Sequence, residues 1–449
     1  MWGFITVMND VLNNAVDDIY HLDEMQRSRI QMVFFGAFFI VSLIYFLISS
    51  LTGKDPINRI GYNRGMIGSL VLCGIGCFLF YPAAKSGSYE MLLLALSVLA
   101  TGVTCLQICA NPYAAIMGRP ESASSRLNLA QGLNSLGTTL APVFGLLLIY
   151  RMFSDGKPTV DAVASSYFLF GSAFILLALI IVFFKLPAYR NEEKIESGFT
   201  VLMNPQLALG IIAIFFYVGS EVTIGNWLVD YLKSINTALD DEQAGYFLSF
   251  YWGGLMIGRV MASFAFDTAM RDAKKYLLMT IASLTLFGVI YLFTGVREQG
   301  GAIHFHFFSP HLIWPFVGAM LLQFVAFRIG KSRPSLSIIV FFSLIFLLLI
   351  ITMCSTGNLA FWSIICTGLF FSIGWSNIFT LAIAGLGKYT SQGSALLVMA
   401  IAGGAVLPRM QALLIKNEVW GIKASFIVPA LGVLYIIFYG WWCSRRKAV

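Results

Sequence analysis

The sequence predicts an all-α membrane protein that crosses the bilayer many times. Of its 449 residues, 58% are hydrophobic and only 11% are charged, and the mean hydropathy is +0.80. A soluble domain carries about 25% charged residues, and the strands of an outer-membrane barrel alternate in a way that dilutes their apolarity. The composition therefore excludes a soluble enzyme, a disordered protein and a secreted disulfide scaffold, and it leaves a bundle of membrane-spanning helices.

A membrane span needs about 20 mostly apolar residues, and fourteen segments of the chain meet or approach this length. We place them near 1–19 (short), 30–52, 65–84, 90–117, 127–150, 164–185, 205–232, 243–266, 275–296, 311–330, 335–353, 358–387, 391–415 and 424–444.

The basic residues predict the orientation of these spans. If the first segment runs outward, eighteen Lys and Arg residues fall in cytoplasmic loops and nine in outer loops, so both termini are expected in the cytoplasm. The net charge of +7 is explained in this way and indicates no nucleic-acid partner. A charged stretch at 185–199 follows the sixth span. We therefore expect a six-helix half at 1–189 whose first span is truncated, a cytoplasmic linker at 190–204 and a second half at 205–449.

An internal repeat is visible between the two halves. A constant offset of 266 residues pairs Asn111 with Asn377, Gly137 with Gly403 and Pro142 with Pro408. The offset between Asp10 and Glu221 is 211, which is 55 shorter, and an additional helix pair in the second half accounts for the difference. We expect this pair at 311–353. A parallel repeat of two six-helix halves describes the major facilitator fold.

Two carboxylates inside spans are the first candidates for function, because such a group costs at least about 2.5 kcal/mol at mid-membrane. Asp10 follows Asn9 in the first span, and Glu221 lies 16 residues into the seventh. A carboxylate that is alternately dry and wet can bind and release a proton, so both are candidates for proton coupling. The alternative for each is a structural hydrogen bond to a neighbouring helix.

Uncharged amides form the second group of candidates, since they offer both donors and acceptors to the hydroxyls of a sugar. Gln107 and Asn111 share one helix face, and Gln131 and Asn134 share another. The alternative is hydrogen bonding between helices, for which amides also serve. Trp375 is the aromatic residue that we expect to stack on a sugar ring. The candidate substrate-binding residues are Asn9, Gln107, Asn111, Gln131, Asn134, Asn226, Trp375 and Asn377.

Other polar residues are expected to be structural. Arg259 is expected to extend to the membrane surface or to pair with a loop carboxylate, and Arg409 is ambiguous. The cysteines lack zinc-type spacing, and His304 and His306 lack a third ligand, so neither a metal nor another cofactor is expected.

Several segments together resemble the fucose–galactose–glucose:proton symporter family of the major facilitator superfamily. They are WGFITVMNDVL, RIGYNRG, CLQICANPYAAIMGRPESASSRLNLAQGLNSLGTTLAP, FYVGSEVTIGNWLVDYL and FTLAIAGLGKYTSQGSALLVMAIAGGAVLP. Within this family, the residue types at Gln107 and Glu221 resemble those of the glucose/galactose (or N-acetylglucosamine) transporter branch. The resemblance implies a twelve-helix core, alternating access and import of a neutral hexose with a cation. It assigns Asp10 to the first-span carboxylate of the family and Gln131 and Asn134 to its amide pair.

The chain departs from the family pattern at four places. The first span lacks its usual beginning, a helix pair is added, Arg409 stands where the family is apolar, and Asn58 is nearest to the position of the family's loop aspartate.

The leading hypothesis is a hexose symporter of a bacterial inner membrane, monomeric in the lipid bilayer and driven by protons. Its substrate would be glucose, galactose, mannose or N-acetylglucosamine. The alternatives are a sodium-coupled symporter and a sugar sensor or receptor that does not transport. A membrane enzyme is the least favoured class, because the loops are mostly short and carry no cluster of acids or histidines.

Overall fold

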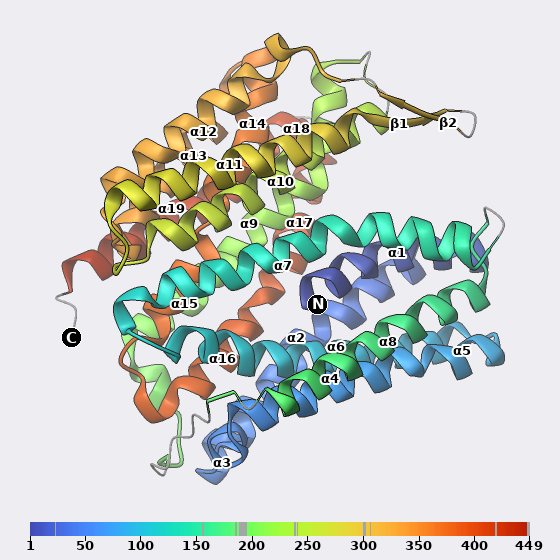
Figure 1. Ribbon diagram of the computed structural model, residues 1–449, viewed down its shortest axis with the longest axis vertical. Helices are drawn as coiled ribbons and strands as arrows, with labels where there is room; N and C mark the ends of the chain where they lie inside the picture. Colours follow the sequence, from blue (N-terminus) through green and yellow to red (C-terminus); the bar gives the residue numbers. More distant parts are fainter. Residues whose placement is uncertain are drawn as a thin grey trace. The chain divides into compact units, whose positions relative to one another are not determined.

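The computed structural model describes residues 1–22, 24–154, 157–184, 186–187, 195–237, 239, 241–299, 302–305, 307–417 and 420–446 (Figure 1). The predicted linker at 190–204 therefore lies partly outside the described residues, since 190–194 are not among them.

Helices make up nearly all of the described structure. The first part of the chain forms α1 (Trp2–Tyr20), α2 (Glu24–Thr52), α3 (Pro56–Ile60), α4 (Tyr62–Phe78), α5 (Phe80–Ser86), α6 (Tyr89–Ile116), η1 (Pro120–Ser122), α7 (Ala123–Gly145), the π-helical η2 (Leu146–Met152), α8 (Val160–Phe183) and η3 (Thr200–Met203). The remainder forms α9 (Pro205–Ile235), α10 (Asp241–Ala265), α11 (Asp272–Gly295), β1 (Val296–Gln299), β2 (Ala302–Phe305), α12 (Pro310–Gly330), α13 (Pro334–Cys354), α14 (Gly357–Phe371), α15 (Gly374–Ile383), η4 (Gly387–Tyr389), α16 (Thr390–Met399), η5 (Ala400–Ala402), α17 (Gly403–Ile415), α18 (Gly421–Ser425) and α19 (Ile427–Arg445).

Twelve helical stretches of the described chain are long and apolar enough to cross a membrane. They coincide with twelve of the fourteen predicted spans. The other two predicted spans correspond to α1 and α10, which are helical but are not among the twelve. Their polar content explains the difference, because α1 carries three Asp and three Asn residues and α10 carries Arg259 inside the span.

A short antiparallel hairpin interrupts the helical order. Strand β1 pairs with β2 so that Val296 lies opposite Phe305 and Gln299 opposite Ala302. This segment follows the predicted span at 275–296, and the sequence analysis did not predict strands. Strand pairing of four residues supplies backbone hydrogen bonds in a connection that is too short and too polar to continue α11.

The chain divides into two compact units. Unit 1 contains Met1–Ile116, Leu136–Ile211 and Ile383–Ala405, and unit 2 contains Met117–Ser135, Ile212–Ala382 and Val406–Val449. In unit 1, α4 packs against both α6 and α8, and α2 packs against α6. Small residues permit these close contacts: a side chain at Gly102 would collide with the backbone of Cys73 on α4. In unit 2, α13 packs against both α14 and α19, and α10 packs against α14.

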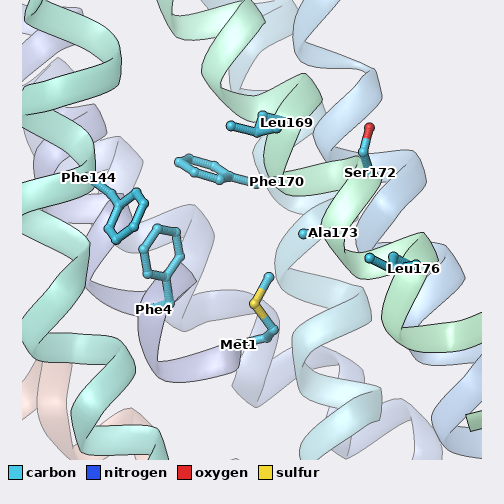
Figure 2. A pocket seen from close by; sticks show the side chains of 8 residues that line it. All are labelled: Met1, Phe4, Phe144, Leu169, Phe170, Ser172, Ala173 and Leu176. Atoms are coloured by element: carbon cyan, nitrogen blue, oxygen red, sulfur yellow. The ribbon is translucent and has the colours of Figure 1, made fainter. Parts of the chain in front are cut away.

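One pocket of unit 1 is apolar. It has a volume of about 380 Å³ and is lined by Met1, by Phe4 of α1, by Phe144 of α7, and by Leu169, Phe170, Ser172, Ala173 and Leu176 of α8 (Figure 2). Its lining has a single hydroxyl and no amide or charged side chain, so it lacks the groups that recognise a sugar.

Candidate functional site

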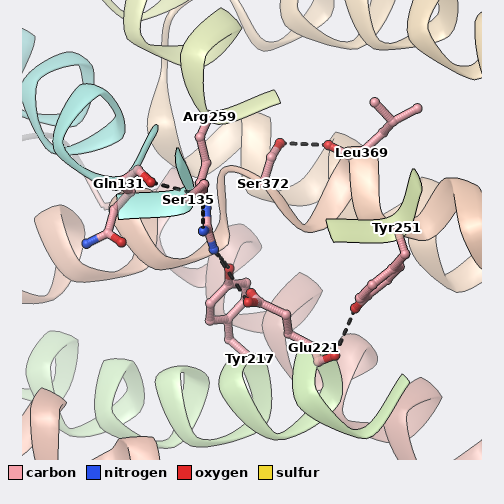
Figure 3. A network of polar contacts seen from close by, with 8 residues as sticks. All are labelled: Gln131, Ser135, Tyr217, Glu221, Tyr251, Arg259, Leu369 and Ser372. Atoms are coloured by element: carbon pink, nitrogen blue, oxygen red, sulfur yellow. Dashed lines mark hydrogen bonds and ion pairs between the residues drawn. The ribbon is translucent and has the colours of Figure 1, made fainter. Parts of the chain in front are cut away.

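Glu221 and Arg259 form an ion pair in the interior of unit 2. Arg259 Nη2 lies 3.4 Å from Glu221 Oε1, and the two side chains are only 10% and 13% exposed, respectively (Figure 3). Glu221 stands near the middle of α9 and Arg259 on α10. The same guanidinium nitrogen is 3.4 Å from the hydroxyl of Tyr217, one turn before Glu221. The prediction that Arg259 extends to the membrane surface is therefore wrong, because a buried carboxylate on the next helix satisfies its charge.

Arg259 also joins α10 to α7. Its Nη1 donates a hydrogen bond of 2.6 Å to the hydroxyl of Ser135, which in turn donates to the backbone carbonyl of Gln131 at 3.0 Å (Figure 3). On the other side of the carboxylate helix, the Tyr251 hydroxyl donates to the Glu221 carbonyl at 2.8 Å. Residues of α7, α9 and α10 that belong to unit 2 thus meet at one buried charge pair.

A second polar contact of unit 2 joins the predicted amide of Asn377 to that of Asn128, which was not among the predicted candidates. Asn128 Nδ2 lies 3.4 Å from Asn377 Oδ1, and both residues are completely buried. Trp375 is 6% exposed, and its ring stacks on Phe379 with centroids 5.8 Å apart. The predicted pair of Gln131 and Asn134 differs in burial: the Gln131 side chain is buried, whereas that of Asn134 is half-buried. Asn226, the remaining candidate of this unit, is exposed on α9.

The first-span carboxylate belongs to a small amide network of unit 1. Gln31 Nε2 donates to Asp10 Oδ1 at 2.6 Å, and Asn9 Nδ2 donates to Gln31 Oε1 at 3.1 Å. Asn9 is 1% exposed, whereas Asp10 is exposed. Within the described part of the chain Asp10 takes part in no ion pair, in contrast to Glu221. The sequence analysis did not select Gln31. This residue is the second of the predicted span at 30–52 and comes shortly after Arg27 and Arg29, so it was grouped with the polar end of the span.

Gln107 and Asn111 also belong to unit 1. Both lie on α6 and are buried, at 7% and 0% exposure. Their shared helix face was predicted from the spacing of four residues.

Buried polar atoms without a protein partner remain in both units of the described structure. In unit 2 they include Glu221 Oε2, Trp375 Nε1 and Asn377 Nδ2, and in unit 1 they include Asn9 Oδ1. A buried donor or acceptor that stays unpaired costs about 1–3 kcal/mol, so such atoms are normally met by water or by a ligand. All four atoms can bind a sugar hydroxyl, and three of them belong to residues that were predicted to bind substrate: Trp375, Asn377 and Asn9.

Asp55 is a further buried carboxylate that the sequence analysis overlooked. Its Oδ1 accepts hydrogen bonds from the Tyr45 hydroxyl at 2.7 Å and from the Asn58 backbone at 3.0 Å. Its Oδ2 accepts from Ser391 at 2.7 Å and from Ser49 at 3.2 Å. Asn58, singled out as nearest to the family's loop aspartate, instead donates to the Lys388 carbonyl at 2.9 Å. Both residues of this loop therefore bind the segment 388–391.

Comparison with known proteins decides the family. The model of the Major Facilitator Superfamily matches residues 3–309. The chain belongs to the Major Facilitator Superfamily. It is 37% identical over 446 residues to the protein named glucose/galactose transporter of Brucella abortus biovar 1 (strain 9-941), covering 98% of this chain and 90% of that protein. It is 32% identical over 453 residues to a putative glucose/galactose transporter of Helicobacter pylori (strain ATCC 700392 / 26695), covering 98% and 93%.

A solved structure supports the fold of this superfamily member. A crystal structure of the fucose:proton symporter of E. coli is similar with a TM-score of 0.73 and 21% sequence identity, covering 99% of this chain and 96% of that one. The predicted all-α major facilitator fold is confirmed, and so is the resemblance to the symporter family. The chain is a multi-pass membrane transporter, and its family and relatives are not enzymes.

Proposed function

We propose that this transporter imports a neutral hexose by symport with a cation, through alternating access. The single observation that carries the proposal is 37% identity over 98% of the chain to a protein named glucose/galactose transporter. The interior is consistent with a neutral, hydroxyl-rich substrate, because it offers amide groups in both units: Gln107 and Asn111 in unit 1, Gln131 and Asn377 in unit 2. The substrate class comprises glucose, galactose, mannose and N-acetylglucosamine.

The two carboxylates differ in a way that suggests separate roles. Proton uptake at Glu221 would break its ion pair with Arg259 and leave a buried guanidinium without its counter-charge. Proton uptake at Asp10 breaks no ion pair among the described residues, and its hydrogen bond from Gln31 reaches one carboxylate oxygen only. We therefore assign the exchange of the coupling proton to Asp10. Glu221 keeps its ion pair with Arg259, and this contact joins α9 and α10 to Ser135 of α7.

Substrate contacts are proposed for residues whose polar atoms have no protein partner in the described structure. Trp375 offers its ring face and Nε1, and Asn377 offers Nδ2. Asn9 offers Oδ1 next to Asp10, so a sugar hydroxyl bound there would sense the charge of the carboxylate. Asn134 and Asn226 are retained as weaker candidates, since the first is half-buried and the second exposed.

We further propose that the protein acts as a monomer in a bacterial inner membrane with both termini in the cytoplasm. The excess of Lys and Arg in alternate loops supports this orientation. The bacterial source of the relatives supports the membrane.

The test is uptake of labelled glucose, galactose, mannose and N-acetylglucosamine by a host that lacks its own sugar transporters. Wild type, Asp10→Asn and Asp18→Asn are compared; the last is a matched control because Asp18 is an exposed residue of the same helix. Wild type and Asp18→Asn are expected to accumulate one of the sugars, and a protonophore is expected to abolish this accumulation. Asp10→Asn is expected to equilibrate the sugar without accumulating it.

Three results would contradict parts of this proposal. Accumulation that survives the protonophore and requires sodium would make sodium the coupling ion. Binding of a sugar by the purified protein without uptake would favour a sensor or receptor. Neither binding nor uptake of any of the four sugars, with the protein present in the membrane, would overturn hexose transport.

A further inference from the structure

Helix packing within each unit indicates which helices of unit 2 are additional. In unit 1 the third long helix, α4, contacts α6 and α8. In unit 2 the helix that contacts the corresponding pair, α14 and α19, is α13. A second contact follows the same pattern: α10 packs against α14 in unit 2, as α2 packs against α6 in unit 1. On this correspondence the extra pair is α11 and α12, at 272–330, whereas the repeat offset alone led us to expect 311–353.

These two helices form a pocket with the end of α10. Its volume is about 370 Å³, and its walls come from Ala265, from the first two turns of α11, from the last turn of α12 and from the α12–α13 turn. Three cations line it: Lys275, Arg328 and Lys331. The lining of the described structure includes a single carboxylate, that of Asp272. The pocket therefore carries a net positive charge.

Lys275 is unusual because it is a buried lysine, with 8% exposure. Its Nζ lies 3.4 Å from the Ser332 hydroxyl and 3.8 Å from Asp272 Oδ1. The Asp272 side chain is 86% exposed, so this long ion pair offers little compensation for the buried charge. Ser332 donates its own proton to the Ala265 carbonyl at 2.7 Å, which leaves its oxygen turned to the lysine. Burying an ammonium group without a close counter-charge is energetically costly, so an anion bound beside Lys275 would stabilise it.

The pocket also has large apolar and aromatic side chains in its lining. Tyr276, Met279 and Phe327 also line it: Tyr276 is next to Lys275 and Phe327 next to Arg328 in the sequence, and Met279 lies one turn after Lys275 on α11. Both α11 and the stretch His311–Gly330 of α12 are among the apolar membrane-crossing helices, and the cations lie in their terminal turns. Large apolar side chains on the same helices are exposed, among them Leu277 and Leu284 on α11 and Val325 on α12. Charge at the helix ends above an exposed apolar surface matches a phosphate group attached to acyl chains.

We propose that α11 and α12 are the additional helix pair and that, with α10, they form a binding site for the phosphate of an anionic phospholipid. Lys275, Arg328 and Lys331 bind the phosphate, and the acyl chains lie along the apolar surface of α11 and α12. The predicted orientation puts this pocket on the cytoplasmic side, where basic pockets between membrane helices meet anionic headgroups. The site involves none of the residues assigned to sugar or proton, so it stands or falls independently of the transported substrate.

The test measures the thermal unfolding of the delipidated protein in detergent as phosphatidylglycerol is added. The variant Arg328→Gln/Lys331→Gln removes two exposed charges of the pocket, and Lys274→Gln/Arg333→Gln removes two exposed charges that do not line it. Wild type and the control are expected to be stabilised at the same lipid concentration. The pocket variant is expected to need about 25-fold more lipid, at about fivefold for each charge removed near a lipid surface.

Other ligands and a second variant separate the possible sources of the effect. Phosphatidylcholine and inorganic phosphate are expected to stabilise none of the proteins at these concentrations. Equal stabilisation by phosphatidylcholine would overturn recognition of a net negative charge, and stabilisation by inorganic phosphate would make the ligand a free anion. Equal lipid dependence in wild type and pocket variant would overturn the site. Lys331→Glu, a charge reversal at an exposed position, also lowers the pocket charge by two. It is expected to weaken the lipid effect about as much as the double variant while leaving the unfolding temperature without lipid unchanged.

Discussion

The Arg259 guanidinium donates a hydrogen bond of 2.6 Å to the hydroxyl of Ser135, which lies 124 positions earlier in the chain. The same side chain is paired with Glu221 at 3.4 Å. One buried cation thus holds a hydroxyl on α7 and a carboxylate on α9. Because burial removes the hydration of both charges, the energy of this arrangement depends on every partner being present.

Removal of one member of the pair is expected to destabilise the protein more than removal of both. Glu221→Gln or Arg259→Gln alone is expected to cost about 3–5 kcal/mol of unfolding free energy, since a buried charge is left without its partner. The double variant is expected to recover most of this loss. Thermal unfolding in detergent measures the effect.

The exposed pair of Arg29 and Glu90 provides a control of nearly equal length. Its atoms are 3.3 Å apart, but the side chains are 46% and 72% exposed. Arg29→Gln and Glu90→Gln are each expected to cost less than about 1 kcal/mol. Additive losses in the Glu221/Arg259 double variant would refute the idea that the two charges compensate one another.

Gln31 is expected to influence proton coupling through Asp10, and its Oε1 also accepts a hydrogen bond of 3.1 Å from Asn9 Nδ2. Gln31→Leu removes the hydrogen bond of 2.6 Å to the carboxylate, and a bond to a charged group is worth about 1.5–3 kcal/mol. We expect the variant to accumulate less sugar than wild type while it still exchanges labelled for unlabelled sugar. Combining Gln31→Leu with Asp10→Asn should have no effect beyond that of Asp10→Asn. A further loss of exchange in the double variant would mean that Gln31 acts on the sugar, either directly or by holding Asn9 through their hydrogen bond.

Much of the fold could be predicted from the sequence, because each membrane-spanning helix requires a run of about 20 mostly apolar residues. Twelve predicted spans were recovered. The rarity of charge inside the predicted spans selected Glu221 as a candidate, and also Asp10, whose helix α1 is not among the twelve. The breaks inside spans were harder. The predicted span at 391–415 is divided by the turn η5, next to Gly403 and Gly404, and propensity alone does not show how far a glycine pair loosens a buried helix.

The candidate site was less predictable, because its residues act through partners remote in the sequence. Nothing in the spacing of Glu221 and Arg259, 38 positions apart on different helices, reports that their side chains meet. Asp55 and Ser391 are 336 positions apart, and their contact depends on how α2 and α16 pack. The sequence pattern identifies polar and charged residues that are costly to bury. Which of these residues pair with one another is determined by how the helices pack.

Asp55 is expected to stabilise unit 1 through its charge. It accepts four hydrogen bonds, and Asp55→Asn replaces one accepting oxygen with a donor that faces hydroxyl groups. We expect a loss of roughly 2–4 kcal/mol, from one or two bonds to a charged group at about 1.5–3 kcal/mol each. Ser391→Ala should reproduce part of this loss. Asp230→Asn, at an exposed position of α9, is the control, and an equal effect there would argue against a specific role for the buried carboxylate.

Trp375 is expected to contribute to sugar affinity through both its ring and its Nε1, which has no protein partner in the described structure. Trp375→Phe keeps a ring that can stack but removes the donor, so KM for the transported hexose should rise about fivefold, the equivalent of one neutral hydrogen bond. Trp375→Leu should raise it further, because the stacking face is lost as well. Trp362 is the matched control: it is 3% exposed and packs against Phe247, Phe250 and Phe361, so Trp362→Phe should leave KM unchanged. If both Phe variants transport with the wild-type KM, the Trp375 indole nitrogen does not bind the sugar, and the unpaired donor is met by water instead.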